Sequence, residues 1–444
     1  MNRTSKDVIL FINSIHAPTY SALRTHAEKT GQRYKPVVIV DSNIKDSIHE
    51  LNEQGHLFGN AELITADFDS SASIREALRP YENRIAAVTA HHENSIHEFK
   101  KLIPYLPYLA TPTETSLEWS TDKKLMRGAF NAYDPTLSPA SMHVKDASAT
   151  TIDTIESALS YPVIIKPSGL ERSLLISKAN NREELQTTLA ATFEQLQTVY
   201  RSYMKRLEPS VLVEEFMVGD MYSVDMYVAS NGTFRHTPLV KIITGNKVGF
   251  EDFFEYLMLT PTGLDEKDTA LAYDTAERAC KALGLRAVTA HCELMKTAHG
   301  WKVIEIGPRV GGYRHEMYGL SYGMNHLMND LLNRAGVEPE IPATIPRYTA
   351  VFRTYAPEEG NLVAVHGTEK IEQLPSFVSM KLRYKKGDAL KFAHNTGDAA
   401  IEITLCNDDE LQLQADIHTI EETLYIEVAA ARPATAKPQL TAKP

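Results

Sequence analysis

The chain has 444 residues, 43% hydrophobic and 23% charged, which predicts roughly two to four globular domains with an ample core. A net charge of −11, without a local basic cluster, argues against nucleic acid or an anionic membrane as a partner. The three cysteines form no CxxC pair and no disulfide framework, which fits a reducing compartment. The apolar run at 8–12 is too short for a signal peptide and no window is long enough to span a bilayer, so we expect a cytoplasmic protein.

The first hundred residues alternate short apolar runs with amphipathic stretches. Three apolar runs predict buried strands: 8–12, 36–41 and 84–90. Two stretches between them predict helices: 20–31 and 44–53. This alternation is typical of a parallel, doubly wound layer, and because no GxGxxG follows the first strand we interpret it as a scaffold or substrate-side domain. His91 and His92 either face a ligand crevice there or lie in a solvated loop.

Closely spaced prolines at 104, 107 and 112 mark a boundary. Beyond it the patterns predict three helices: 115–131, 182–205 and 267–283. They also predict a strand–loop–strand unit at 161–177, strands at 210–217 and 222–229 around a tight turn at 218–220, and a hairpin over 287–307. The segment 341–430 is again strand-dominated, and the Pro/Ala/Lys-rich residues 431–444 are expected to be disordered.

The hairpin carries two acidic residues that could share a metal ion. If its turn centres on His299, Glu293 and Glu305 are directly opposed on one face of the sheet. Two such carboxylates repel each other, whereas a cation bound between them makes the interaction attractive. Because carboxylate oxygens are hard ligands, they select Mg²⁺ or Mn²⁺. A register shift of one residue would instead send both into water.

A small-residue turn, 307–312, leaves the second strand and places Arg309 four residues past Glu305. A guanidinium beside a metal site suits a phosphate or a developing oxyanion, because it can donate two hydrogen bonds at once. Taken singly, an arginine in a turn is usually part of a surface salt bridge.

Lys166 ends another apolar run and precedes Ser168 and Gly169. A lysine at the mouth of a strand, before a Ser/Gly loop, can hold a phosphate while backbone N–H groups cover it. Ser173 could add a hydroxyl donor, and Lys123 could reach the same phosphates from the preceding helix. By itself the loop is a weak signal, and lone helix lysines are mostly solvated.

Glu214 and Glu215 follow directly on an apolar strand and precede Phe216 and Met217. Extended backbone at this place can present C=O and N–H groups to the edge of an adenine, while apolar side chains cover its faces. A strand that simply runs into a surface turn explains the segment equally well.

In this order, five segments together resemble the ATP-grasp superfamily. They are TDKKLMR (121–127), YPVIIKPSG (161–169), VEEFMVGDMYSVD (213–225), HCELM (291–295) and EIGPRVGG (305–312). The resemblance covers about the middle half of the chain and implies the α/β (α+β) ATP-grasp fold, with an N-terminal parallel layer and a C-terminal β-rich part. It divides the chain into an N-terminal domain, 1–112, an ATP-grasp domain, 113–340, and a C-terminal subdomain, 341–430. Within the middle domain the nucleotide lid covers about 150–230 and the metal and catalytic core about 231–340.

For the nucleotide, the resemblance implies that Lys123 and Lys166 contact the ATP phosphates. Glu214, Glu215 and Met217 would form the adenine hinge, largely through backbone groups.

For the metal, the resemblance implies that Glu293 and Glu305 hold Mg²⁺ between the phosphates and that Arg309 stabilises the acyl-phosphate and the tetrahedral intermediate. The family usually has an asparagine two residues after the second glutamate, as a further metal ligand. Gly307 stands there in this chain, so a second metal would be held differently or more weakly.

The ribose contact also departs from the family, which commonly has Gly-x-Glu after the hinge. Here the triplet is Gly219-Asp220-Met221, so that contact is missing or shifts to Asp220. Neither departure removes the lysines, the metal glutamates or the arginine, so we favour an active enzyme over a non-catalytic nucleotide-binding protein.

Within the superfamily, AHCELM and EIGPRVGG are similar to carboxylate–amine ligases, notably the L-amino-acid ligases that make dipeptides. The resemblance implies small-molecule carboxylate and amine substrates, ATP and Mg²⁺, and it leaves the oligomeric state open, a homodimer included. The region 236–256, with Tyr313, Arg314 and His315, is expected to line the carboxylate pocket. The alternative is a bicarbonate-phosphorylating carboxylase, which the absence of a glycine-rich lid after Lys166 disfavours.

Overall fold

The computed structural model describes residues 6–44, 61–169, 175–202, 210–250, 253–344, 346–391 and 398–430. These residues form four sheets with helices packed around them, in the α/β (α+β) class that the sequence predicts. Among the helices described, none combines the length and the apolar character needed to cross a membrane. Ser173, the tail at 431–444 and almost all of the helix predicted at 44–53 lie outside the described residues.

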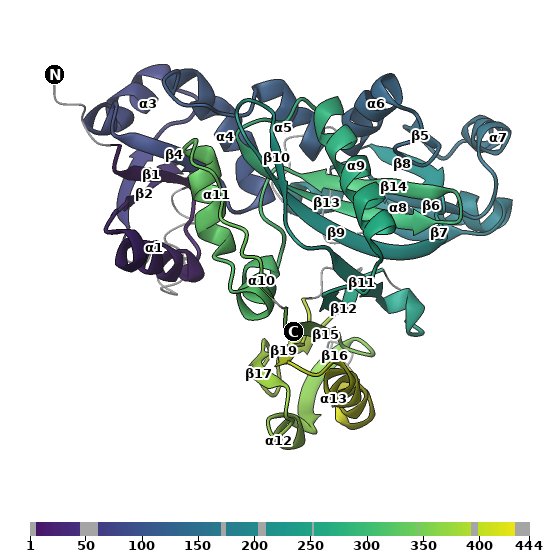
Figure 1. Cartoon of the computed structure of the whole chain (residues 1–444). Helices are drawn as coiled ribbons and strands as arrows, with labels where there is room; N and C mark the ends of the chain where they lie inside the picture. The colour runs from purple at the N-terminus through teal and green to yellow at the C-terminus, as the bar shows by residue number, and fades with distance from the viewer. Residues whose placement is uncertain are drawn as a thin grey trace, which may run out of the picture.

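The N-terminal layer is a parallel sheet, as predicted, and Figure 1 shows it at the purple end of the chain. Its strand order is β3-β2-β1-β4. Its strands are β1 (Val8–Ile12), β2 (Lys35–Asp41), β3 (Glu62–Ala66) and β4 (Ile85–Thr89). Apolar side chains of α1 (Ala17–Thr30) and of the distant α11 (His326–Arg334) pack on one face. The other face packs against α3 (Ser71–Leu78), α4 (Ile96–Leu102) and α5 (Glu114–Thr121). The edge strand β3 was not predicted, because it is mostly exposed and has no continuous apolar run.

The helix predicted over 115–131 is in fact two helices, α5 and α6 (Lys123–Tyr133), so that prediction was wrong. Asp122 is extended between them, and its carboxylate accepts hydrogen bonds from the backbone N–H groups of Lys124 and Leu125. A short acidic side chain competes for backbone donors in this way and starts a new helix. The break places Lys123 in the first turn of α6, where its N–H donates to the carbonyl of Ser168.

A second, antiparallel sheet has the order β5-β8-β6-β7. Its strands are β5 (Ser141–Val144), β6 (Val163–Pro167), β7 (Ser177–Ala179) and β8 (Val211–Glu215). Residues of α7 (Ala149–Ala158) and α8 (Arg182–Ser202) share a hydrophobic core with these strands.

The largest sheet has the order β14-β13-β9-β11-β12-β15-β19-β17, with β10 paired to β9. Its central strands are β9 (Gly219–Val228), β10 (Phe234–His236), β11 (Val240–Thr244), β12 (Glu255–Thr260), β13 (Val288–Thr297) and β14 (Gly300–Gly307). Helix α9 (Glu266–Ala282) and α6 bury apolar side chains against β9, β13 and β14, and α10 (Arg314–Tyr322) packs on β11, β12 and β15. The predicted turn at 218–220 is instead a crossover, because β8 and β9 belong to different sheets.

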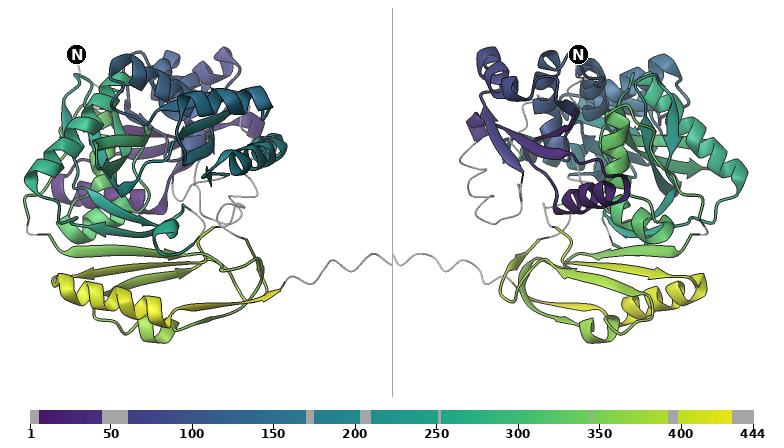
Figure 2. Two further views of the ribbon diagram at one scale, coloured as in Figure 1. Left: turned by 90° about the vertical axis from the view of Figure 1, so that its right-hand side faces the viewer. Right: turned by 60° about the vertical axis from the view of Figure 1, so that its left-hand side comes forward.

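The C-terminal strands continue the same large sheet. Strand β15 (Tyr348–Thr354) pairs with β12, and β19 (Ile401–Asn407) and β17 (Phe377–Leu382) follow it. A separate sheet contains β16 (Gly360–His366), β18 (Ala389–Leu390) and β20 (Tyr425–Ala430), beside α12 (Thr368–Ile371) and α13 (Glu410–Thr423). Figure 2 shows these elements as a yellow-green layer below the rest of the molecule. Because β15 is itself a strand of the largest sheet, side chains of the C-terminal segment can reach a cavity formed on that sheet.

Candidate active site

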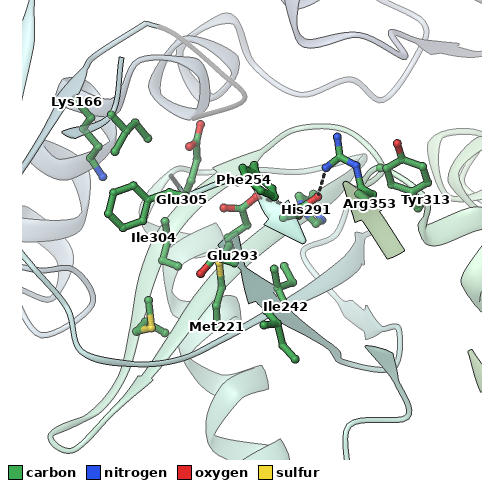
Figure 3. Close-up of a pocket in the computed structure, with 18 of the residues that line it drawn as sticks. Lys166, Met221, Ile242, Phe254, His291, Glu293, Ile304, Glu305, Tyr313 and Arg353 are labelled. Carbon is green, nitrogen blue, oxygen red and sulfur yellow. Dashed lines mark hydrogen bonds and ion pairs between the residues drawn. The ribbon is translucent and has the colours of Figure 1, made fainter. Parts of the chain in front are cut away.

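One cavity of about 890 Å³ lies where the N-terminal layer, the antiparallel sheet β5-β8-β6-β7 and the largest sheet meet. Figure 3 shows Lys166 at one end of it, Tyr313 and Arg353 at the other, and Glu305, Glu293 and His291 between them. Residues far apart in the sequence therefore line one cavity.

Glu293 and Glu305 are paired across β13 and β14, as the sequence predicts, although the turn is not centred on His299. Thr297 pairs with Gly300, and a β-bulge at Ile304 then brings the two glutamates opposite each other. Both line the cavity, and their side chains are 27% and 25% exposed.

Lys123 and Glu305 form an ion pair inside the cavity, with 2.9 Å between Nζ and Oε1. Burial pulls the pKa of Lys123 down, but the carboxylates of Glu305, Glu93 and Glu293 outweigh it and raise that pKa. Burial likewise opposes ionisation of Glu305, and Lys123 more than compensates, so its pKa is lowered. At neutral pH the ion pair therefore joins a charged lysine to an ionised Glu305.

Lys166 also lines the cavity and forms an ion pair with the buried carboxylate of Glu214. The same carboxylate accepts from Arg127 Nε at 2.6 Å, and Arg127 donates to the carbonyl of Ile304 at 2.7 Å. Burial lowers the pKa of Lys166 to about 8, with Glu214 opposing the shift. The Glu214 side chain is thus an internal counter-ion. Arg127, which sequence reasoning missed, ties it to the bulged residue beside Glu305.

The hinge predicted after β8 lies along the cavity wall. Glu215, Phe216, Met217 and Asp220 all line the cavity, and Lys178 Nζ lies 4.6 Å from the centroid of the Phe216 ring. Flanking apolar residues complete this wall: Ile164, Ile176, Met221, Met295 and Ile304. The arrangement suits the edge and the faces of a flat heterocycle.

Pro167, directly after Lys166, lines the cavity, but Ser168 does not. Ser168 is buried, its N–H donates to the carbonyl of Ser210, and its Oγ has no hydrogen-bond partner. Gly169 follows it and is absent from the lining. Ser173 falls outside the described residues, so its predicted role stays a prediction.

Arg309 lines the cavity four residues after Glu305, and its Nη2 lies 3.2 Å from the carboxylate of Glu93. Glu93 follows β4, so the N-terminal layer contributes directly to this part of the site. His91 and His92 also line the cavity, in agreement with the alternative that they face a ligand crevice. The Nε2 atoms of His92 and His16 lie 2.9 Å apart.

The buried carboxylate of Asp225, on β9, connects His291 of β13 to the loop after Arg309. It contacts His291 Nδ1 at 2.6 Å and His326 Nε2 at 2.7 Å, and it accepts from the Gly311 N–H at 2.8 Å. Burial alone would raise the pKa of Asp225, but the two histidines hold it well below its usual range. Sequence reasoning missed this network, although an Asp inside the apolar pattern of β9 was a signal for it.

The residues present fit a magnesium ion and a nucleoside triphosphate. The described residues contain no cluster of three or more acidic, histidine or cysteine side chains that could hold a metal alone. Mg²⁺ in phosphate-transfer sites is held by one or two carboxylates, with phosphates and water completing its shell. Glu293 and Glu305, with two lysines in the same cavity, match that donor set.

Residues 159–316 match the family model of the ATP-grasp domain. The chain is 25% identical over 240 residues to alanine–anticapsin ligase of Bacillus amyloliquefaciens, covering 52% of this chain and 49% of that protein. It is 33% identical over 136 residues to D-alanine–D-alanine ligase of a Marinomonas species, covering 30% of this chain and 38% of that protein. The chain thus spans about half or less of the length of these curated relatives.

Two solved structures share the whole architecture. L-amino acid ligase from Bacillus licheniformis matches with a TM-score of 0.75 and 16% identity, over 97% of this chain and 100% of that one. N5-carboxyaminoimidazole ribonucleotide synthetase from Thermotoga maritima matches with a TM-score of 0.64 and 15% identity, over 96% and 100%. At these identities the likeness concerns the fold, which is the ATP-grasp fold.

Proposed function

We propose that this chain, which contains an ATP-grasp domain at residues 159–316, is an ATP-dependent ligase that joins a carboxylate to an amine and releases ADP and phosphate. The carboxylate is an amino acid or a small peptide. The observation that carries the proposal is the convergence of Glu293, Glu305, Lys123 and Lys166 on one cavity. Relatives named as amino-acid ligases support the substrate class.

In the first half-reaction, a carboxylate oxygen of the donor attacks the γ-phosphorus of ATP, and ADP leaves. Lys123 and Lys166 bind and orient the phosphates, and the hinge residues 214–217 hold the base. Glu293 and Glu305 would hold a divalent ion, which when bound would supply neutralising charge for phosphoryl transfer.

In the second half-reaction, the amine nitrogen attacks the acyl carbon and the bond from that carbon to the phosphate oxygen breaks. The proton that the nitrogen loses leaves with the phosphate as hydrogen phosphate, and the amide remains. Arg309 provides fixed positive charge to the tetrahedral oxyanion and the departing phosphate.

A coupled assay of ADP release across amino-acid pairs with Mg²⁺ tests the proposal. Wild type should release ADP only when a donor and an amine are both present, whereas Lys166→Ala and Glu305→Ala should be at least about a hundredfold slower. Lys29→Ala, which removes an exposed lysine outside the cavity, is the matched control. Absence of amine-dependent ADP release with every pair would count against a ligase. Turnover with bicarbonate and no amine would indicate a carboxylase, and nucleotide binding without any turnover a non-catalytic protein.

Hydroxylamine separates the two half-reactions. It is a small amine that converts an acyl-phosphate into a hydroxamate, so donor-dependent hydroxamate reports the first half-reaction without the natural amine. Its absence with all donors would contradict the acyl-phosphate route.

A further inference from the structure

The end of the cavity remote from Lys166 is built around Arg353 of β15 (Figure 3). Its guanidinium carbon lies 5.3 Å from the centroid of the Tyr313 ring and 5.5 Å from that of Tyr355. Two aromatic rings therefore lie against the cation.

The rings are themselves held in place. The Tyr313 hydroxyl donates to Glu402 at 2.5 Å, and Glu402 also accepts from Arg383 at 2.6 Å. Tyr313 adopts φ of +61°, a left-handed conformation that costs free energy for an aromatic residue. Such backbone strain persists where the surroundings enforce it, and it is concentrated at ligand clamps.

Arg353 is incompletely satisfied by the protein. It donates to Glu255 at 3.3 Å and to the Tyr355 hydroxyl at 2.8 Å, while its buried Nε has no hydrogen-bond partner. Glu255 also lies 4.0 Å from the buried guanidinium of Arg314. In the described part of the chain, these contacts make Glu255 one carboxylate shared between two guanidinium groups, whereas Glu402 and Asp398 pair with Arg383.

The position of the reacting centre limits which substrate group can meet Arg353. The phosphorylated carboxylate must lie beside the metal glutamates, between the nucleotide end and Arg353. A second carboxylate at Arg353 must therefore belong to another part of a substrate, and an amine that is itself an amino acid carries one.

We propose that Arg353 is the receptor for the α-carboxylate of the amine substrate, so that the enzyme selects amino acids as acceptors and discriminates against amines without a carboxylate. This inference rests on the proposed ligase function. The guanidinium binds the carboxylate by charge-assisted hydrogen bonds while the rings of Tyr313 and Tyr355 fix its plane.

The test compares an acceptor with its own primary amide, using the full chain, ATP, Mg²⁺ and the donor–acceptor pair that releases ADP fastest. In wild type, kcat/KM for the free acid should exceed that for the amide by about 10- to 100-fold. In Arg353→Gln this ratio should fall to about one, through a higher KM for the acid with the amide little changed. Arg353→Lys, which keeps the charge but loses the planar fork, should retain part of the preference. Arg347→Gln, which removes an exposed arginine just before the same strand, should behave as wild type.

Hydroxamate formation keeps this test separate from that of the ligase function. Donor-dependent hydroxamate in Arg353→Gln at the wild-type donor KM shows that the variant is folded and that ATP chemistry persists. An acid-to-amide ratio near one in wild type, or an equal loss with acid and amide in Arg353→Gln, overturns the proposal. A raised donor KM in the hydroxamate assay also overturns it, because the recognised carboxylate would then belong to the donor.

Discussion

Glu293 lies directly across from Glu305 because Ile304 bulges out of the strand between Val303 and Glu305. In the part of the ladder next to the turn, Leu294 pairs with Val303. If that register continued unbroken, Glu293 would pair with Ile304 and Glu305 would point to the other face of the sheet. The bulge is stabilised on its backbone, since the carbonyl of Ile304 accepts from Arg127. One extra residue in β14 thus creates the acidic pair.

Replacing either glutamate of this pair should increase the requirement for divalent metal. For Glu293→Gln and Glu305→Gln we expect the Mg²⁺ concentration at half-maximal ADP release to rise about 10- to 100-fold, because each removes one anionic ligand. A titration of activity against Mg²⁺ measures this. Glu338→Gln, on an exposed side chain that pairs with Arg235, is the control and should not shift the midpoint. An unchanged midpoint in both cavity variants would contradict metal binding here.

The sequence predicted the parts of this fold that local pattern controls. The apolar runs of β1, β2 and β4 are fully or largely buried strands, and the predicted hairpin forms. The predicted pairing of the two glutamates is also present, but it depends on a bulge that the spacing did not indicate. It failed where a single polar side chain overrides the pattern, as Asp122 does between α5 and α6.

Sequence reasoning missed several side-chain partners that tertiary structure brings together. Arg127 meets Glu214 across 87 residues, and Asp225 meets His326 across 101. Arg353 reaches the cavity only because β15 extends the central sheet. None of these pairings leaves a periodic trace in the chain, because both members are brought together by packing of different elements.

Nucleotide binding to the free protein should weaken as the pH rises through about 8. The pKa of Lys166 is lowered by burial to about 8, so the lysine is charged below this pH and neutral above it. Only the charged form attracts phosphate. The dissociation constant for ATP, measured calorimetrically between pH 7 and pH 9.5, should therefore rise through this window. Lys166→Arg, which stays charged, should flatten the profile, and the same pH dependence in that variant would contradict the assignment.

Removing the buried charge of Asp225 should destabilise the fold strongly. Asp225→Asn leaves two buried histidines without their carboxylate, and we expect the free energy of unfolding to fall by about 3–5 kcal/mol. The folded protein depresses the pKa of Asp225. Its stabilising contribution is therefore present at pH values above the pKa it has in the unfolded chain, and it is lost only as the pH falls through its pKa in the folded protein. Urea unfolding at pH 7 therefore measures the full effect. Asp69→Asn, at an exposed pair with Lys101, should cost less than about 1 kcal/mol, and equal losses in the two variants would contradict this account.

Two adjacent glycines in the loop after Arg309 should respond very differently to a methyl group. A Cβ at Gly311 would lie 2.4 Å from His291 Nδ1 and 2.7 Å from Arg314 Cγ, whereas a Cβ at Gly312 meets nothing within 4 Å. For Gly311→Ala we expect a loss of about 1–3 kcal/mol in stability, from overpacking against His291. We also expect kcat to fall about tenfold or more, because the displaced loop carries Arg309. Gly312→Ala should match wild type in both urea midpoint and kcat. If the two alanine variants behaved alike, the close packing of this loop on His291 would not be what holds Arg309 at the cavity.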